Sequence, residues 1–164
     1  MLNIFIKLDV PKQIDDRVVL TFDSRQKSRL RVTLVSGEDA ALFLERGNIL
    51  RGGDLLEAED GKVIEVVAAK QQVMKVTADS HETLMKAAYH LGNRHVPLEV
   101  GNGWLLLEQD HVLKEMLIGL GVSVSDEELP FEPEAGAYGG GHRHHDDSGS
   151  PSIRPPSRIL KNAR

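Results

Sequence analysis

The sequence predicts an α+β protein: a β-rich domain, a second domain of alternating strands and helices, and a disordered tail that contains histidine. In the first part of the chain, short runs of branched residues alternate with turn residues. In the second part the hydrophobic period shifts between that of strands and that of helices. In the last part, glycine, serine and proline leave little to bury. We therefore divide the chain into residues 1–72, 73–138 and 139–164.

The first domain contains four runs that predict strands and no run with sustained helical periodicity. The strands are expected at residues 18–22, 30–35, 54–58 and 63–68. The last two flank Glu59-Asp60-Gly61-Lys62, a sequence typical of a hairpin turn. Short strands of this kind bury their apolar faces against one another, so we expect a small antiparallel barrel or sandwich.

The second domain contains one helix before and one helix after a predicted hairpin. Asp79 lies three residues before Glu82, a spacing similar to a capping box, and Gly92 is placed to end that helix. The other helix is expected to begin at about Asp110. Strands are expected at residues 74–77, 96–100, 104–107 and 122–124. The resulting order, βαββαβ, is the ferredoxin-like arrangement.

Composition and charge exclude several classes of protein. The 164 residues include no cysteine, which rules out disulfides, zinc fingers and a thiol nucleophile. A net charge of -5 and an aromatic share of 4% argue against a nucleic-acid partner, which requires basic and stacking groups. No apolar run approaches the roughly 20 residues of a membrane-spanning helix. With no leader-like segment visible, we expect a cytoplasmic protein without a membrane partner.

Histidine is the only residue type that suggests distinctive chemistry, and the chain has seven. His142, His144 and His145 lie within four residues, interleaved with Arg143 and followed by two aspartates. Imidazole ligands suit Ni2+, Cu2+ and Zn2+, and a flexible stretch can adapt several of them to one ion. The alternatives are a solubilising tail and an expression tag, although a tag would be an unbroken run of histidines. We expect a tail that binds metal.

Four further histidines lie in the second domain, and their positions alone leave their roles open. His81 falls near a helix start, where an imidazolium gains nothing from the helix dipole, so a surface position is expected. His90, at the end of that helix, suits a capping role as well as a metal. His95 follows the helix and by position alone resembles an ordinary loop histidine. His111 follows Asp110, a pair that suits either a weak metal site or a helix N-cap.

Signatures of catalysis are missing from the sequence. It contains no P-loop, no G-x-S-x-G elbow and no H-E-x-x-H motif. A metal-dependent hydrolase would need a carboxylate base beside an open metal position. Glu99 and Asp110 are available for that role, but no spacing supports either. We therefore expect a protein that is not an enzyme.

Three blocks of the second domain together form a highly specific pattern. The first block is Tyr89-His90-Leu91-Gly92-Asn93-Arg94-His95-Val96-Pro97-Leu98. The others are Asp110-His111-Val112-Leu113 and Leu129-Pro130-Phe131-Glu132-Pro133-Glu134-Ala135-Gly136-Ala137-Tyr138. In the first domain, Arg46-Gly47 and Leu50-Arg51-Gly52-Gly53-Asp54 also match. These blocks closely resemble the urease accessory protein UreE family, a family of nickel metallochaperones. The resemblance covers residues 1–138, and members of the family typically end in a variable histidine-rich tail.

The resemblance implies a peptide-binding-like first domain and a second domain that binds metal and forms a homodimer. His95 matches the histidine that meets its symmetry mate and binds nickel across the dimer interface. His111 matches a more peripheral ligand position. His142, His144 and His145 of the tail would then complete the coordination, and the same ligands would accept Zn2+ or Cu2+.

The resemblance also implies that Ni2+ passes to the urease accessory GTPase and the apo-urease accessory complex. Gln109 departs from the pattern, since some members carry a second peripheral histidine there, and Glu45 stands where proline is expected. Because the ligands are neutral imidazoles, metal binding should weaken as the pH falls through about 6.5. The competing hypothesis is a peptide- or protein-binding co-chaperone module whose tail binds metal only incidentally.

Overall fold

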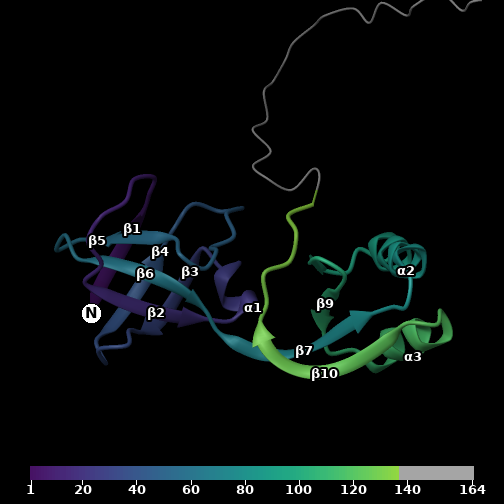
Figure 1. Ribbon diagram of the computed structural model, residues 1–164. Helices are drawn as coiled ribbons and strands as arrows, with labels where there is room; N and C mark the ends of the chain where they lie inside the picture. The colour runs from purple at the N-terminus through teal and green to yellow at the C-terminus, as the bar shows by residue number, and fades with distance from the viewer. Residues whose placement is uncertain (137–164) are drawn as a thin grey trace, which may run out of the picture.

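The computed structural model describes residues 1–136. Figure 1 shows two β-sheet domains, joined where β6 leads into β7. The predicted α+β class, with a β-rich domain followed by a domain of strands and helices, is confirmed. The expected tail, residues 139–164, lies outside the described residues together with His142, His144 and His145. No helix within residues 1–136 is long and apolar enough to span a bilayer.

The N-terminal domain is a six-stranded sheet that curls into a nearly closed barrel. Its strands are β1 (Leu2–Leu8), β2 (Asp16–Leu20), β3 (Arg29–Thr33), β4 (Asp39–Phe43), β5 (Leu55–Ala58) and β6 (Val63–Ala68), in the spatial order β2-β6-β5-β1-β4-β3. The short helix α1 (Phe22–Arg25) follows β2. Beyond β3, the Val35 amide donates to the Arg17 carbonyl of β2 at 2.8 Å, which draws the two edges together. Apolar residues from all six strands fill the interior.

Three features of this domain differ from the expectation. The sheet is mixed rather than antiparallel, because β1 runs parallel to β4 and β2 runs parallel to β6. The predicted runs omit β1 and β4; in β4 the central residues 40–42 are all buried, so the strand shows no alternation of apolar and polar residues. Phe22, expected at the end of a strand, instead begins α1, because the Thr21 side chain caps that helix by accepting from the Ser24 amide.

The C-terminal domain has the predicted ferredoxin-like order. Its elements are β7 (Lys70–Thr77), α2 (His81–Asn93), β8 (Glu99–Val100), β9 (Leu105–Glu108), α3 (His111–Gly119) and β10 (Ser123–Pro130). The strands form an antiparallel sheet in the order β10-β7-β9-β8. The two helices pack on one face of this sheet through a core made of Met74, Val76, Ala87, Leu91, Leu105, Leu107, Leu113, Leu117 and Val122.

The opposite face of this sheet contributes to a second apolar cluster shared with the N-terminal domain. Val73 and Leu106, which alternate with the helix-facing residues of β7 and β9, pack with Phe22 of α1 and Phe131 beyond β10. The Phe22 and Phe131 rings meet edge to face with their centroids 5.4 Å apart. The two domains therefore share a small core at the place where the chain leaves β10.

Several boundaries in the C-terminal domain differ from the expectation, and β7 and β8 begin at residues 70 and 99 rather than 74 and 96. The N-cap of α2 is Ser80 rather than Asp79, because the Ser80 hydroxyl accepts from the Thr83 amide at 3.2 Å. The helix continues through Gly92 to Asn93. Strand β10 continues to residue 130, far beyond the expected 124, because it pairs with β7 along its whole length. Residues 125–128 of this strand are polar, so a search for apolar runs does not detect it.

Candidate metal site at the end of helix α2

Helix α2 ends in a Schellman motif that places His95 just beyond its last turn. The His95 amide donates to the Gly92 carbonyl at 3.0 Å, and the Val96 amide donates to the Leu91 carbonyl at 3.3 Å. This pair of hydrogen bonds defines the motif. Leu91 and Val96 also belong to the same apolar cluster, a contact that commonly accompanies it. The end of the helix is thus well fixed, and His95 occupies the motif's left-handed position.

His95 has a φ of 54°, the only positive φ of a non-glycine residue in the described part of the chain. A left-handed backbone brings Cβ close to a carbonyl oxygen and costs about 1–2 kcal/mol, so glycine is usual at this position. The residue is exposed, so burial of the side chain does not offset this cost. Backbone strain at an exposed residue of this kind points to a role for its side chain outside folding.

His95 lines a groove of about 400 Å3 between the two domains. Residues 96–98 and 134–136 form much of its lining, and Phe22 and Ile49 of the N-terminal domain complete it. The Glu134 amide donates to the Leu98 carbonyl at 2.8 Å, which holds the two lining segments together. The last described residues of the chain therefore run beside His95.

Within residues 1–136, no group of three histidine or carboxylate side chains is placed to hold a metal ion. A metal site at His95 therefore needs ligands from the tail or from a second copy of the chain. Gly136 lines the groove, and His142 follows it by six residues. A chain of that length reaches roughly 20 Å when extended. The tail histidines are thus within reach of His95 by length alone.

None of the other described histidines lines this groove. His81, the first residue of α2, is exposed as expected. His90 is exposed on the last turn of α2, where its ring meets that of Tyr89 at 5.5 Å, and the C-cap of the helix is Arg94 instead. His111 is exposed as the first residue of α3. The structure therefore separates His95 from the other three.

The residues beside His111 serve the fold of α3. The Asp110 carboxylate accepts from two amides of the first helical turn, at 2.9 and 3.0 Å, so it is the N-cap of α3. Gln109 donates to the Asp126 carboxylate of β10 at 3.1 Å and ties the start of the helix to the sheet. Of the two interpretations left open for Asp110, the N-cap is the one that the structure shows.

Sequence reasoning missed a polar cluster close to the groove. Arg25 is fully buried, and its guanidinium lies 2.6 Å from the Glu132 carboxylate. Glu99 accepts from the Glu132 amide at 2.7 Å, and burial raises the pKa of Glu99 above its ordinary value although this hydrogen bond lowers it. Arg25 falls in a polar stretch with no apolar period to mark it as buried. The only signal for Glu132 is its place in the third UreE-like block.

Comparison with protein families matches both domains to one family. Residues 5–69 match the model described as UreE urease accessory protein, N-terminal domain, and residues 71–153 match the model for the C-terminal domain. The chain belongs to the UreE family of urease accessory proteins. The resemblance seen in the sequence is therefore confirmed. The block of residues 89–98 that carried much of it forms the end of α2 and much of the His95 groove.

Several UreE proteins are closely similar to the chain. It is 59% identical to the urease accessory protein UreE of Cupriavidus necator over 132 residues, which are 80% of this chain and 69% of that protein. It is 57% identical to the UreE of Ralstonia nicotianae, again over 80% of this chain but only 63% of that longer protein. It is 53% identical to the UreE of Dechloromonas aromatica over 145 residues, 85% of this chain and 83% of that protein.

The family name describes an accessory protein rather than an enzyme. On that ground the expectation that the chain is not an enzyme is confirmed. The name also places the UreE proteins in the maturation of urease.

Proposed function

We propose that this UreE-family protein is a metallochaperone that binds Ni2+ and delivers it for assembly of the urease active site. The observation that carries the proposal is the position of His95. Its exposed side chain stands on a left-handed backbone at the end of α2, in the groove along which the described chain ends. Imidazole is a good ligand for nickel. In this proposal, binding of the ion is the reason why histidine and not glycine occupies the strained position.

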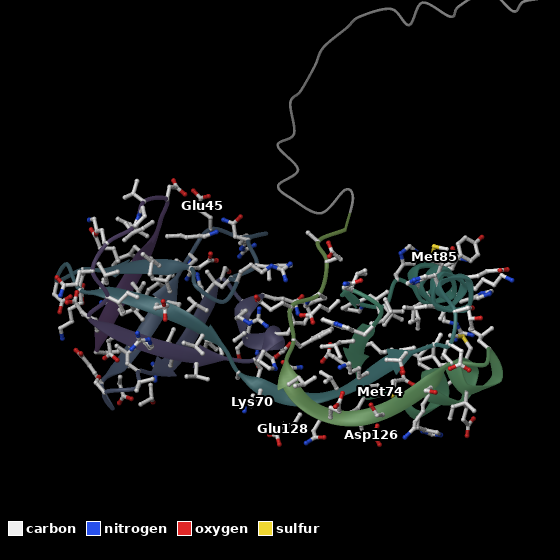
Figure 2. The ribbon with its side chains drawn as sticks, viewed as in Figure 1. Glu45, Lys70, Met74, Met85, Asp126 and Glu128 are labelled. Atoms are coloured by element: carbon white, nitrogen blue, oxygen red, sulfur yellow. The ribbon has the colours of Figure 1, made fainter. Side chains whose placement is uncertain are left out.

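The proposal includes a homodimer, because the described part of one chain supplies one imidazole at the groove and a second copy would supply another. A two-fold axis beside His95 turns one ligand into two. Exposed apolar residues of α2 and β8 support such an interface: Met85 and Tyr89 of α2 are 65% and 67% exposed, and Val100 of β8 is 52% exposed. Figure 2 shows Met85 on the side of α2 that faces away from the sheet. Apolar groups gathered on the surface of a single chain are typical of a protein interface.

The remaining ligands come, in this proposal, from His142, His144 and His145. Few and exchangeable imidazole ligands suit a protein that must release its cargo. Residues 73–138 carry four basic and eleven acidic side chains, an imbalance that favours the approach of a cation. His111 is then an outlying ligand, and Zn2+ or Cu2+ would compete for the same imidazoles.

We assign metal binding and dimerisation to residues 73–138, adjustable ligands to residues 139–164, and contact with partner proteins to residues 1–72. The bound ion passes to the urease accessory GTPase and then to the apo-urease accessory complex, in the cytoplasm. The close similarity to proteins named as urease accessory proteins supports this direction of transfer.

Calorimetric titration with Ni2+ tests the proposal. His95→Ala should weaken the tightest site at least tenfold, which corresponds to about 1.4 kcal/mol. The matched control is His81→Ala, which removes an exposed histidine from the other end of the same helix and should leave that site unchanged. Light scattering of each protein should show a dimer. An unchanged nickel affinity in His95→Ala would overturn the proposal.

A second candidate function, a peptide- or protein-binding module, is favoured by one surface of the N-terminal domain. The exposed rings of Phe5 and Phe43 stack there with their centroids 5.4 Å apart, and the Arg29 guanidinium lies 5.9 Å above Phe43. Beside them lies β3, an outer strand of the sheet, and such strands can pair with an added segment. Binding of partner proteins that persists after chelation of the metal would favour this function over the first.

A further inference from the structure

Arg25 lies at the end of α1, and its side chain is fully buried between the two domains. On the N-terminal side, its guanidinium donates to the Leu20 carbonyl at 3.3 Å and to the Leu50 carbonyl at 3.1 Å. On the C-terminal side, it donates to the Phe131 carbonyl and, at 2.6 Å, to the Glu132 carboxylate. A guanidinium can make all of these contacts because its five N–H groups point in fixed directions.

Further hydrogen bonds from both domains hold the segment that follows β10. Glu132 Oε1 accepts from the Gly52 amide of the N-terminal domain at 3.1 Å. The Glu132 amide donates to Glu99 Oε1 at 2.7 Å, and the Glu134 amide donates to the Leu98 carbonyl at 2.8 Å. Figure 1 shows this segment rising between the two domains. We call residues 131–134 with Arg25 the clasp, and it fixes the chain as far as the groove of the metal site.

The Arg25–Glu132 pair is better suited to fixing geometry than to adding stability. The two side chains are 0% and 34% exposed, so the guanidinium has lost all of its water. That desolvation costs several kcal/mol, and an apolar pair of similar volume is often as stable as a buried ion pair. The directional hydrogen bonds of the guanidinium, in contrast, hold the backbone at Phe131 and the side chain of Glu132 in a defined place. The clasp therefore sets the path of the chain into the groove.

We propose that Arg25 is a positioning residue for the metal site: it holds the segment after β10 so that the tail histidines start beside His95. This inference deepens the proposed function and rests on it. It gives the N-terminal domain a part in metal binding, although the domain contains no histidine. The contribution acts through the effective concentration of the tail imidazoles at the groove.

The size of the effect follows from the length of the tether. With the clasp intact, six residues carry the chain from Gly136 to His142. With the clasp open, the tether starts at Pro130, the end of β10, and is twelve residues long. Effective concentration falls roughly as the -3/2 power of tether length, so doubling the length lowers it about threefold. The contribution of the tail to nickel affinity should fall by about that factor when the clasp opens.

The test variant combines Arg25→Met with Glu132→Gln, so that neither partner is left as an unpaired buried charge. The matched control combines Arg17→Met with Glu65→Gln, which removes an Arg–Glu pair of the N-terminal domain, 3.0 Å apart. Its two side chains are 55% and 26% exposed, and this pair lies on two strands of that domain, apart from residues 131–134. Each is prepared in the full chain with its tail histidines intact, and again with all three changed to glutamine. Every protein is titrated with Ni2+ by calorimetry.

The measured quantity is the ratio of nickel affinities with and without the tail histidines. This ratio should be the same in the wild type and the control, and about threefold smaller in the clasp variant. Hydrogen exchange of the Glu134 amide, which donates to Leu98, should also become faster in the clasp variant. An unchanged ratio in a protein whose binding still depends on His95 would overturn the inference alone. Binding independent of His95 would instead overturn the proposed function.

A milder variant keeps the inference testable if the double variant does not fold. Glu132→Gln alone keeps an oxygen for the Gly52 amide but weakens the bond to Arg25, and it should lower the ratio in the same direction. Trp104, the single tryptophan, packs in the apolar cluster that contains Phe131, so its fluorescence reports whether that cluster is intact. Native fluorescence with an unchanged affinity ratio in this variant also counts against the inference.

Discussion

His95 and Gly121 occupy the same position in two copies of one helix-ending motif. At the end of α3, the Gly121 amide donates to the Ile118 carbonyl at 3.0 Å and the Val122 amide to the Leu117 carbonyl at 3.5 Å. This is the same bond pattern that ends α2. The φ angles are 88° at Gly121 and 54° at His95. The two helices of the ferredoxin-like domain therefore end in the same left-handed backbone conformation with two different residues, and only glycine adopts this conformation without strain.

The shared position predicts how stability changes at each site. Changing glycine to alanine in a left-handed position should cost about 1 kcal/mol, after the greater freedom of glycine in the unfolded chain is counted. We therefore expect His95→Gly to exceed His95→Ala in free energy of unfolding by about 1 kcal/mol. The free energy of unfolding of Gly121→Ala should be lower than that of the wild type by the same amount. Urea denaturation in nickel-free buffer measures all four proteins.

The same variants separate stability from binding. Both His95→Gly and His95→Ala lack the imidazole, so under the proposed function both should lose the tightest nickel site to the same degree. A control is Gly119→Ala at the end of α3, where nothing lies within 4 Å of an added Cβ and φ is not positive. It should raise stability by about 0.5–1 kcal/mol. Equal stability of the two His95 variants would show that the left-handed backbone carries no cost.

Much of the fold could be predicted from the sequence because local signals agreed with the final packing. The second domain shows this best: apolar residues at helical spacing, such as Leu113 and Leu117, became the buried face of α3. The missed elements lack such a signal. Residues 40–42 of β4 are buried on both faces, and residues 125–128 of β10 are polar. Both strands form because a long-range partner is present, which no local pattern records.

Part of the candidate site could likewise be predicted from the sequence, and part could not. The family-like block identified His95, but its left-handed backbone follows from the two hydrogen bonds that end α2 and could not be read from the residue alone. Arg25 and Glu132 are 107 residues apart, and their contact depends on how the two domains meet. No period or motif connects residues so distant in the chain. Such contacts are visible only in the folded structure.

Changing His142, His144 and His145 to glutamine tests the tail ligands without shortening the chain. Since the described chain ends at Gly136 in the groove of His95, six residues before His142, we expect the affinity or the number of ions bound to fall, by tenfold or more in affinity if one tail imidazole completes the site. The apolar face of α2 is untouched, so the dimer should persist. Calorimetry measures the nickel affinity and the number of ions bound, and light scattering measures the mass of the particle. Loss of the dimer in this variant would show that the metal, and not the apolar face, holds the copies together.

The role of Asp110 can be tested apart from that of His111. Asp110→Ala removes the acceptor of two amides at the start of α3 and should lower stability by about 1 kcal/mol, whereas Asp110→Asn keeps an oxygen for them and should cost less. Ser80→Ala, which removes one such bond from α2, is the matched control. Thermal unfolding measures the stability of each variant. If Asp110→Asn lost nickel while keeping its stability, the carboxylate would be a metal ligand as well as a cap.

Glu99 should make stability depend on pH. Burial raises the pKa of its carboxyl in the folded protein, so between the ordinary and the raised pKa the folded state binds more protons than the unfolded state, and stability falls as the pH rises. Above both values, the ionised carboxylate is a constant cost to folding. Glu99→Gln removes this cost and keeps an oxygen to accept from the Glu132 amide. We expect the variant to be more stable than the wild type at pH 7.

The advantage of Glu99→Gln should shrink as the pH falls through the raised pKa and vanish below the ordinary pKa, because the wild-type carboxyl is then neutral in both the folded and the unfolded state. Urea denaturation at pH 7 and at about pH 4, in nickel-free buffer, measures the difference. Glu128→Gln is the control, since Figure 2 shows Glu128 pointing outward from β10, and the residue is exposed. A stability gain that stayed constant from pH 7 to pH 4 would mean that Glu99 acts through its shape and not its charge. In that case the ionised carboxylate of Glu99 would not lower the stability of the folded protein at neutral pH.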